Sequence, residues 1–149
     1  MQRSDPPGGA VFIELPARLE NLQAFIAPVL AVARALPLGE ERCSNLELAL
    51  EESLVNICNY AYPDRDGTVR ISSRPEQDRL IVGIEDNGIA FSLVEAAVPD
   101  LSVDLPDRKI GGLGVHLVRS LMDEVRYRRE ADRNLLELVL FFHDAEVST

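Results

Sequence analysis

Positive charge is scarce in this chain of 149 residues. It has 15 lysine and arginine residues against 25 aspartate and glutamate residues, which gives a net charge of −10. Binding to nucleic acid needs a basic face for phosphate contacts, and docking on anionic lipid needs one as well. The composition therefore argues against a nucleic acid or a membrane surface as a direct partner.

A long hydrophobic run is also missing. The most apolar stretch, residues 24–38, is interrupted by Pro28 and Pro37 and is too short to span a bilayer. Residues 1–9 are polar and lack the apolar core of a signal peptide. The hydrophobic fraction of 46% is nevertheless that of a globular domain with a core of its own.

Cysteine and histidine are rare, with two of each. Cys43 and Cys58 fall in one predicted helix, about 22 Å apart along its axis, which is beyond disulfide reach. Neither cysteine forms a metal-ligand spacing with histidine. We expect reduced thiols and a cytoplasmic protein.

Hydrophobic periodicity predicts an α+β fold in which helices cover one face of a sheet. We expect a two-layer α/β sandwich with a mostly antiparallel mixed sheet. Pro28 should kink or break the first helix. Residues 87–112 carry weak periodicity, which is typical of a functional lid or of a mobile segment. The predicted strands are 11–15, 68–74, 80–85, 124–130 and 134–142, and the predicted helices are 18–36, 39–62 and 114–122. They form one domain over 11–142, between a disordered tail over 1–10 and a polar tail over 143–149.

The first candidate site lies on the second predicted helix. Glu52 and Asn56 are four residues apart and share a face, and Asn59 and Tyr60 continue it. A solvated polar stripe would explain such a pattern. Alternatively, the Asn56 carbonyl oxygen could bind Mg²⁺, which prefers oxygen ligands together with phosphates, and Glu52 could activate a hydroxyl.

The second candidate is Asp86 followed by Gly88, directly after a predicted strand. Asn-Gly is ordinary turn chemistry, so a simple strand end would explain it. In a nucleotide site, the Asp86 carboxylate would accept a hydrogen bond from an exocyclic amine, as in adenine. Gly88 would let the base approach the backbone closely.

The third candidate is the glycine run Gly111, Gly112 and Gly114, with Leu113, which opens the last predicted helix. Backbone N–H groups at such a helix start can bind phosphates, although a flexible hinge would look the same. Lys109, the chain's single lysine, precedes the run and could meet a polyphosphate or simply be a solvated charge. The pair Arg128 and Arg129 is interpreted as a solvated strand edge.

The order of these motifs resembles the ATP-binding (Bergerat) fold shared by histidine kinases, gyrase, Hsp90 and MutL. Within that histidine kinase-like superfamily, the chain looks most like the small bacterial anti-sigma factor serine/threonine kinases of the RsbW and SpoIIAB type. The resemblance covers residues 11–142. One departure is Tyr60, which stands where many members carry histidine.

The resemblance implies a role for each motif residue. Asn56 would hold Mg²⁺ and Glu52 would be the general base, with Asn59 beside the nucleotide. Asp86 and Gly88 would recognise adenine, and Phe91 matches an aromatic residue that often follows. The phosphates would be met by Lys109, Gly111, Gly112, Leu113 and Gly114.

The resemblance also implies ATP and Mg²⁺ as cofactors, a homodimer, and two protein partners: a sigma factor and a STAS-domain anti-sigma antagonist that is phosphorylated on serine. Two other functions stay open. One is a nucleotide-gated protein-binding module with little or no kinase activity, and the other is a scaffold domain that has lost its nucleotide. The intact motif set argues against the scaffold.

Overall fold

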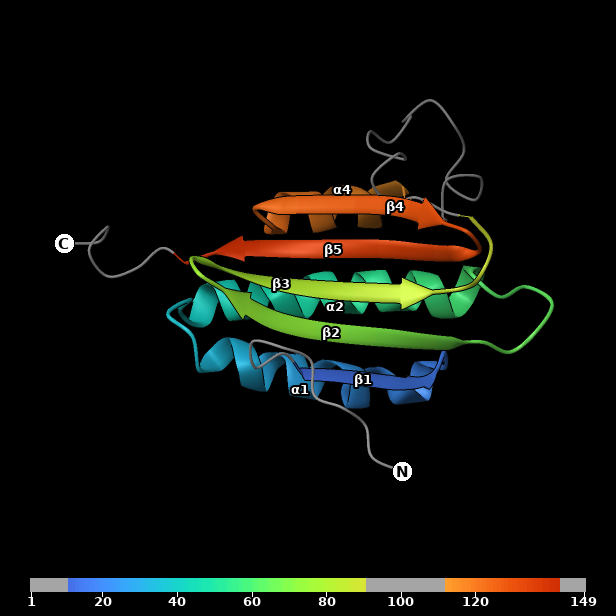
Figure 1. Ribbon diagram of the computed structural model, residues 1–149, viewed down its shortest axis with the longest axis horizontal. Helices are drawn as coiled ribbons and strands as arrows, with labels where there is room; N and C mark the ends of the chain where they lie inside the picture. Colours follow the sequence, from blue (N-terminus) through green and yellow to red (C-terminus); the bar gives the residue numbers. More distant parts are fainter. Residues whose placement is uncertain (1–10, 91–111, 143–149) are drawn as a thin grey trace.

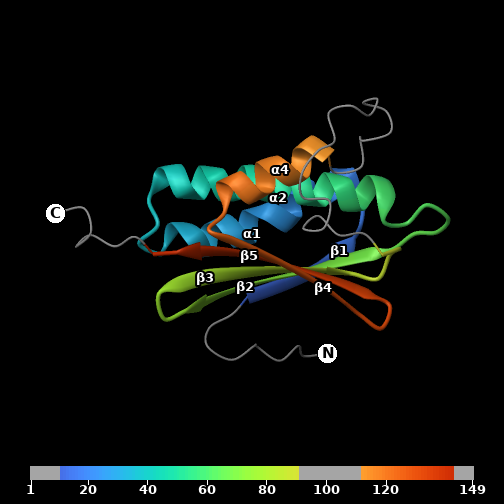
Figure 2. The same ribbon diagram turned by 90° about the horizontal axis from the view of Figure 1, so that it is seen from above.

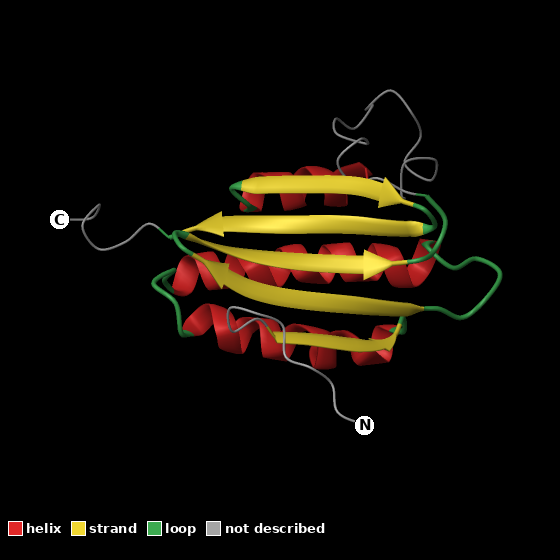
Figure 3. Cartoon of the chain, in the orientation of Figure 1, coloured by secondary structure: helices red, strands yellow, loops and turns green. Residues whose placement is uncertain are grey.

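The described part of the chain folds into two layers, a five-stranded sheet with three α-helices on one of its faces (Figures 1 and 2). The computed structural model describes residues 11–90 and 112–142, with the side chains of 112–115 outside this description. Figure 3 shows the same arrangement by secondary structure. The elements are β1 (Val11–Pro16), a 3-10 turn (Leu19–Asn21), α1 (Leu22–Arg34), α2 (Glu40–Tyr60), β2 (Thr68–Glu76), β3 (Arg79–Asp86), α4 (Gly112–Leu121), β4 (Glu124–Glu130) and β5 (Arg133–Phe141).

The strand order is β1-β2-β3-β5-β4, and every pairing among the described strands is antiparallel. The expected α+β sandwich is confirmed, but the parallel pairing implied by a mixed sheet does not occur within it. Two-residue turns at Gln77–Asp78 and Ala131–Asp132 join neighbouring strands directly, and such hairpins are antiparallel by construction. Gln77 and Ala131 have positive φ angles of 47° and 55°.

The first helix begins later than predicted and is not broken. The α1 helix runs continuously through Pro28, although proline removes one backbone hydrogen bond. The carbonyl that loses this bond belongs to Ala24, an exposed residue, so water can hydrate it. The break expected at Pro28 is therefore wrong, because the helix is continuous through this proline.

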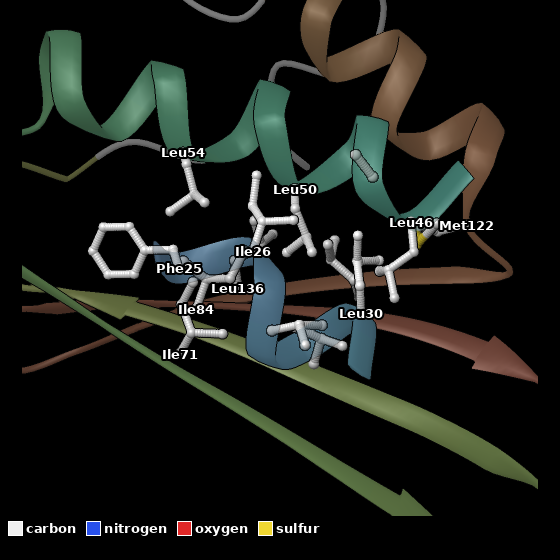
Figure 4. Packing of buried hydrophobic residues seen from close by; sticks show 14 of the residues in the cluster. Phe25, Ile26, Leu30, Leu46, Leu50, Leu54, Ile71, Ile84, Met122 and Leu136 are labelled. Carbon is white, nitrogen blue, oxygen red and sulfur yellow. The ribbon is translucent and has the colours of Figure 1, made fainter. Parts of the chain in front are cut away.

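The core lies between the three helices and the inner face of the sheet. Figure 4 shows α1 and α2 residues such as Phe25, Leu50 and Leu54 packing against the strand residues Ile71 and Ile84. All five are almost fully buried. No helix within the described part of the chain is long and apolar enough to cross a membrane.

Candidate functional site

Four elements meet at one end of the domain. Figure 1 shows that α2 and β3 end there, and that β5 and α4 begin there. Antiparallel pairing of β3 with β5 places Asp86, the last residue of β3, opposite Asn134 near the start of β5. Asp86, the predicted base-recognition residue, thus lies beside the end of α2, the helix that carries Glu52 and Asn56.

Side chains from four strands form one row across the sheet at this level. Val69 of β2 pairs with Asp86, Asp86 pairs with Asn134, and Asn134 pairs with Arg129 of β4. Side chains directly opposite each other on one face of a sheet are close enough to interact. Asp86 and Asn134 are each 5% exposed, so this row buries a carboxylate and an amide.

Asn134 is the centre of the hydrogen-bond network. Its amide nitrogen donates to Asp86 Oδ1 at 2.9 Å and to the Ile89 carbonyl at 2.8 Å. Its amide oxygen accepts from the Tyr127 hydroxyl at 2.6 Å and from Arg129 Nη1 at 3.1 Å. An asparagine amide offers two donor hydrogens and one acceptor oxygen with two lone pairs. Asn134 is thus fully engaged with the protein and serves to hold Asp86 in place.

Asp86 Oδ1 accepts a second hydrogen bond, from the Gly88 backbone N–H at 2.8 Å. Burial raises the pKa of this carboxyl, and the hydrogen bonds from Asn134 and Gly88 and the positive charge of Arg129 oppose that shift in part. The two donors on one oxygen fix the orientation of the carboxylate. A buried, oriented acceptor of this kind suits recognition of an amine.

A pocket opens between α2 and the sheet at this point. Its apolar walls come from Ile57 and Ala61 at the end of α2 and from Tyr127 and Leu136 on the strands, and its polar groups are Ser53, Asn56, Asp86 and Asn134. The enclosed volume is about 20 Å³, which takes a water molecule but not a purine ring. A base would therefore lie at the mouth of this pocket or require its walls to separate.

The first candidate motif contributes Asn56 to this pocket. Asn56 is 8% exposed, so the interpretation of this motif as a solvated stripe is wrong for that residue. Glu52 is half-buried one helical turn earlier on α2, and Asn59 is exposed. The pocket-lining residues include Asn56 but neither Glu52 nor Asn59. The structure thus joins Asn56 to Asp86 and leaves the other two at the periphery.

Gly88 is packed against the end of α2. A Cβ atom built on Gly88 would lie 2.3 Å from the Ala61 carbonyl oxygen, which is too close for any side chain. The same carbonyl accepts a hydrogen bond of 2.8 Å from the Ile89 N–H. Glycine is needed here for packing of the loop on the helix, a reason that the sequence argument about approach of a base did not include.

Two arginines and a tyrosine hold the loop from Asn87 to Gly88. Arg65 donates to the Asn87 carbonyl at 2.5 Å, and Arg129 donates to the Gly88 carbonyl at 2.9 Å. The Asn87 N–H donates to the Tyr62 hydroxyl at 3.0 Å. Arg129 is exposed, as expected of a solvated strand edge, but it also ties β4 to this loop.

The remaining predicted residues fall outside what the structure describes. This applies to Phe91, Lys109 and Gly111, and to the side chain of Leu113. Gly112 is the first residue of α4, so Gly112 and Gly114 both lie in its first turn, two residues earlier than the predicted helix start. Backbone N–H groups in a first helical turn lack intrahelical partners.

Sequence reasoning missed Asn134, Tyr127 and Ser53. Residues 134, 136, 138 and 140 alternate toward the core, so Asn134 is a polar residue at a buried strand position. Ser53 similarly interrupts the apolar face of α2. A polar side chain at a core position was the available signal in both cases.

The comparison with known families now identifies the class. The histidine kinase-like ATPase domain model matches residues 15–140, and the chain therefore belongs to this family. Among similar curated proteins, the serine-protein kinase RsbW of Listeria monocytogenes serovar 1/2a is 28% identical over 121 residues, 78% of this chain and 77% of that protein. RsbW of Bacillus mycoides is 24% identical over 128 residues, 83% and 80% of the two chains. These matches confirm the resemblance inferred from the three motifs.

Proposed function

We propose that this protein binds ATP with Mg²⁺, sequesters a sigma factor, and phosphorylates a STAS-domain antagonist on serine. The observation that carries the proposal is the buried Asp86 carboxylate, oriented by two donors in a pocket of a histidine kinase-like ATPase domain. The similarity to proteins named serine-protein kinase supports the choice of reaction.

The residues that line the pocket have the chemistry that recognition of an adenine ring at its mouth requires. Asp86 supplies an acceptor for the exocyclic amine, while Ile57, Ala61 and Leu136 supply apolar contacts for the faces of the ring. Tyr127 adds an aromatic side chain to the same wall. Because adenine is common to ATP and ADP, this part of the site should bind both.

Asn56 is the residue that would hold Mg²⁺ through its side-chain oxygen. Among the residues the structure describes, no three His, Cys, Asp or Glu side chains gather as metal ligands. Mg²⁺ commonly takes one or two protein ligands and fills its other positions with phosphate and water. When bound, the ion would neutralise charge on the transferred phosphoryl group.

Glu52 lies one helical turn from Asn56 and would accept the proton of the substrate serine hydroxyl. The serine oxygen forms a bond to the γ-phosphorus while the bond from that phosphorus to ADP breaks. The proposal includes binding of the phosphates by Lys109 and residues 111–114. It also includes a homodimeric state and a location in the cytoplasm.

Calorimetric titration with ATP and ADP, with and without Mg²⁺, tests the nucleotide part. We expect saturable binding of both nucleotides, strengthened for ATP by Mg²⁺. A well-folded protein that binds neither nucleotide would overturn the proposal.

Mass spectrometry of STAS-domain proteins from the source organism, incubated with the protein and Mg²⁺-ATP, tests the kinase part. Binding without serine phosphorylation would leave the nucleotide-gated binding module as the function.

A further inference from the structure

The Ser53 hydroxyl stands out among the polar groups of the pocket. Ser53 is 0% exposed and lies on α2, one turn before Ile57. Its Oγ has no hydrogen-bond partner, although the side chain lines the pocket together with Asp86. A buried hydroxyl without a partner costs free energy, so a protein normally supplies one.

Two other polar groups of the pocket, Asn134 and Asp86, have protein partners. Both amide hydrogens of Asn134 are donated, and its oxygen accepts two hydrogen bonds. Asp86 is an acceptor, and its Oδ1 already receives two bonds. Ser53 therefore offers the pocket an uncommitted donor beside a fixed acceptor.

We infer that Ser53 is a further ligand-recognition residue, whose hydroxyl donates a hydrogen bond to a ring nitrogen of the bound adenine. This inference rests on the proposed nucleotide function. The adenine edge has an amine hydrogen donor next to ring nitrogens that only accept. An acceptor at Asp86 and a donor at Ser53 complement that edge. If the base stays at the mouth, the bond passes through the one water that the enclosed volume takes, and the hydroxyl is needed either way.

The variant Ser53→Ala separates this role from a structural one. The hydroxyl has no protein partner, so its removal should leave the free energy of unfolding of the ligand-free protein unchanged or raise it. Affinity for ATP and ADP should fall by roughly threefold to tenfold, the effect of one hydrogen bond. Ser44→Ala is the matched control, since Ser44 is an exposed serine of the same helix and should change neither quantity.

Deaza analogues of ATP, each with one ring nitrogen replaced by C–H, test the bond itself. One analogue should bind the parent protein more weakly than ATP and bind Ser53→Ala no more weakly than ATP does. Equal losses for every analogue in both proteins would overturn the inference, as would a loss of stability in Ser53→Ala with unchanged affinity.

The failures of the two proposals are distinguishable. A parent protein that binds no nucleotide would overturn both the nucleotide function and the role of Ser53. A parent that binds ATP, together with a Ser53→Ala variant that binds it equally well, would overturn only the role of Ser53.

Discussion

Asn134 donates a hydrogen bond of 2.9 Å to the Asp86 carboxylate, although the two residues are 48 positions apart in the chain. Their contact follows from the antiparallel register of β3 and β5. This bond holds the Asp86 carboxylate at the pocket. Asn134 itself has no hydrogen-bonding capacity left for a ligand. Positioning and recognition are thus divided between two side chains on neighbouring strands.

The first prediction concerns recognition by Asp86. In Asp86→Asn, the amide oxygen can still accept from Gly88 and Asn134, so the fold should be retained. The new amide donor would face the amine of adenine, and we expect ATP and ADP to lose affinity alike. Calorimetric titration of both nucleotides measures this, with thermal unfolding as the check on folding. Unchanged affinity for both would exclude a role for Asp86 in base recognition.

The second prediction concerns pH. Burial raises the pKa of Asp86, so its protonation on acidification begins at a higher pH than for an ordinary aspartate. ATP affinity of the parent protein should fall as the pH is lowered through that pKa, because the protonated group loses acceptor capacity. The residual affinity of Asp86→Asn should lack this component. Titrations at a series of pH values compare the two proteins, and parallel profiles would contradict the assignment.

The same shift has a consequence for stability, with a defined sign. A raised pKa in the folded state means that the native protein binds the proton more tightly than the unfolded chain does. The stabilising contribution of Asp86 is fully present below its unfolded pKa and is lost as the pH rises through the folded pKa. Relative to Asp86→Asn, the parent should therefore gain stability on acidification, which urea unfolding at several pH values would show.

The third prediction concerns the network around Asn134. Asn134→Ala leaves the Tyr127 hydroxyl and the Ile89 carbonyl without this partner, and we expect the free energy of unfolding to fall by about 1–3 kcal/mol. Tyr127→Phe removes one of the bonds and should cost less, about 1 kcal/mol. Urea unfolding measures both. An Asn134→Ala variant as stable as the parent would show that the network does not hold the site.

The fourth prediction concerns Gly88. Gly88→Ala places a methyl group against the Ala61 carbonyl and should destabilise the protein by about 1–3 kcal/mol. Hydrogen exchange of the Ile89 amide should become faster, since that amide bonds to the same carbonyl. Gly83→Ala is the control, because its nearest atom is the Ser72 hydroxyl, which can rotate away. Equal effects of the two substitutions would contradict this account.

The fifth prediction separates catalysis from binding. Glu52→Gln should lower the rate of serine phosphorylation on the order of 10²–10⁴-fold while ATP affinity stays close to that of the parent. Glu51→Gln is the matched control, a neighbouring half-buried glutamate on α2. Phosphorylation at the parental rate by the Glu52 variant would remove Glu52 from the mechanism.

Local sequence signals predicted the elements well and the contacts between them poorly. Alternation and turn residues located all five strands, and helical spacing located α1 and α2, because these patterns arise within a few residues. The recognisable motifs around Asn56 and Asp86 lie toward the C-terminal ends of α2 and β3. The partnership of Asp86 with Asn134 depends on register between β3 and β5, which neither strand encodes alone.

Sequence reasoning also left out the roles of Arg129 and Gly88 that depend on tertiary contacts. In the sequence Arg129 has the pattern of an ordinary exposed strand residue, but in the fold it donates a hydrogen bond to the Gly88 carbonyl. Gly88 was expected to make room for a base, and the structure adds that its lack of a side chain makes room for the end of α2. Both roles come from the packing of a loop against distant elements, which residue spacing does not report.

The cross-strand row at Val69, Asp86, Asn134 and Arg129 limits how this domain can change in length. Deletion of Asn134 would put Leu135 in its place, and any insertion or deletion inside β5 would reverse the inward and outward faces of the residues beyond it. The Ala131–Asp132 turn lies outside the row and can grow without disturbing it. Length variation in a lineage that keeps the site should therefore accumulate in that turn and be absent from the strand beside it.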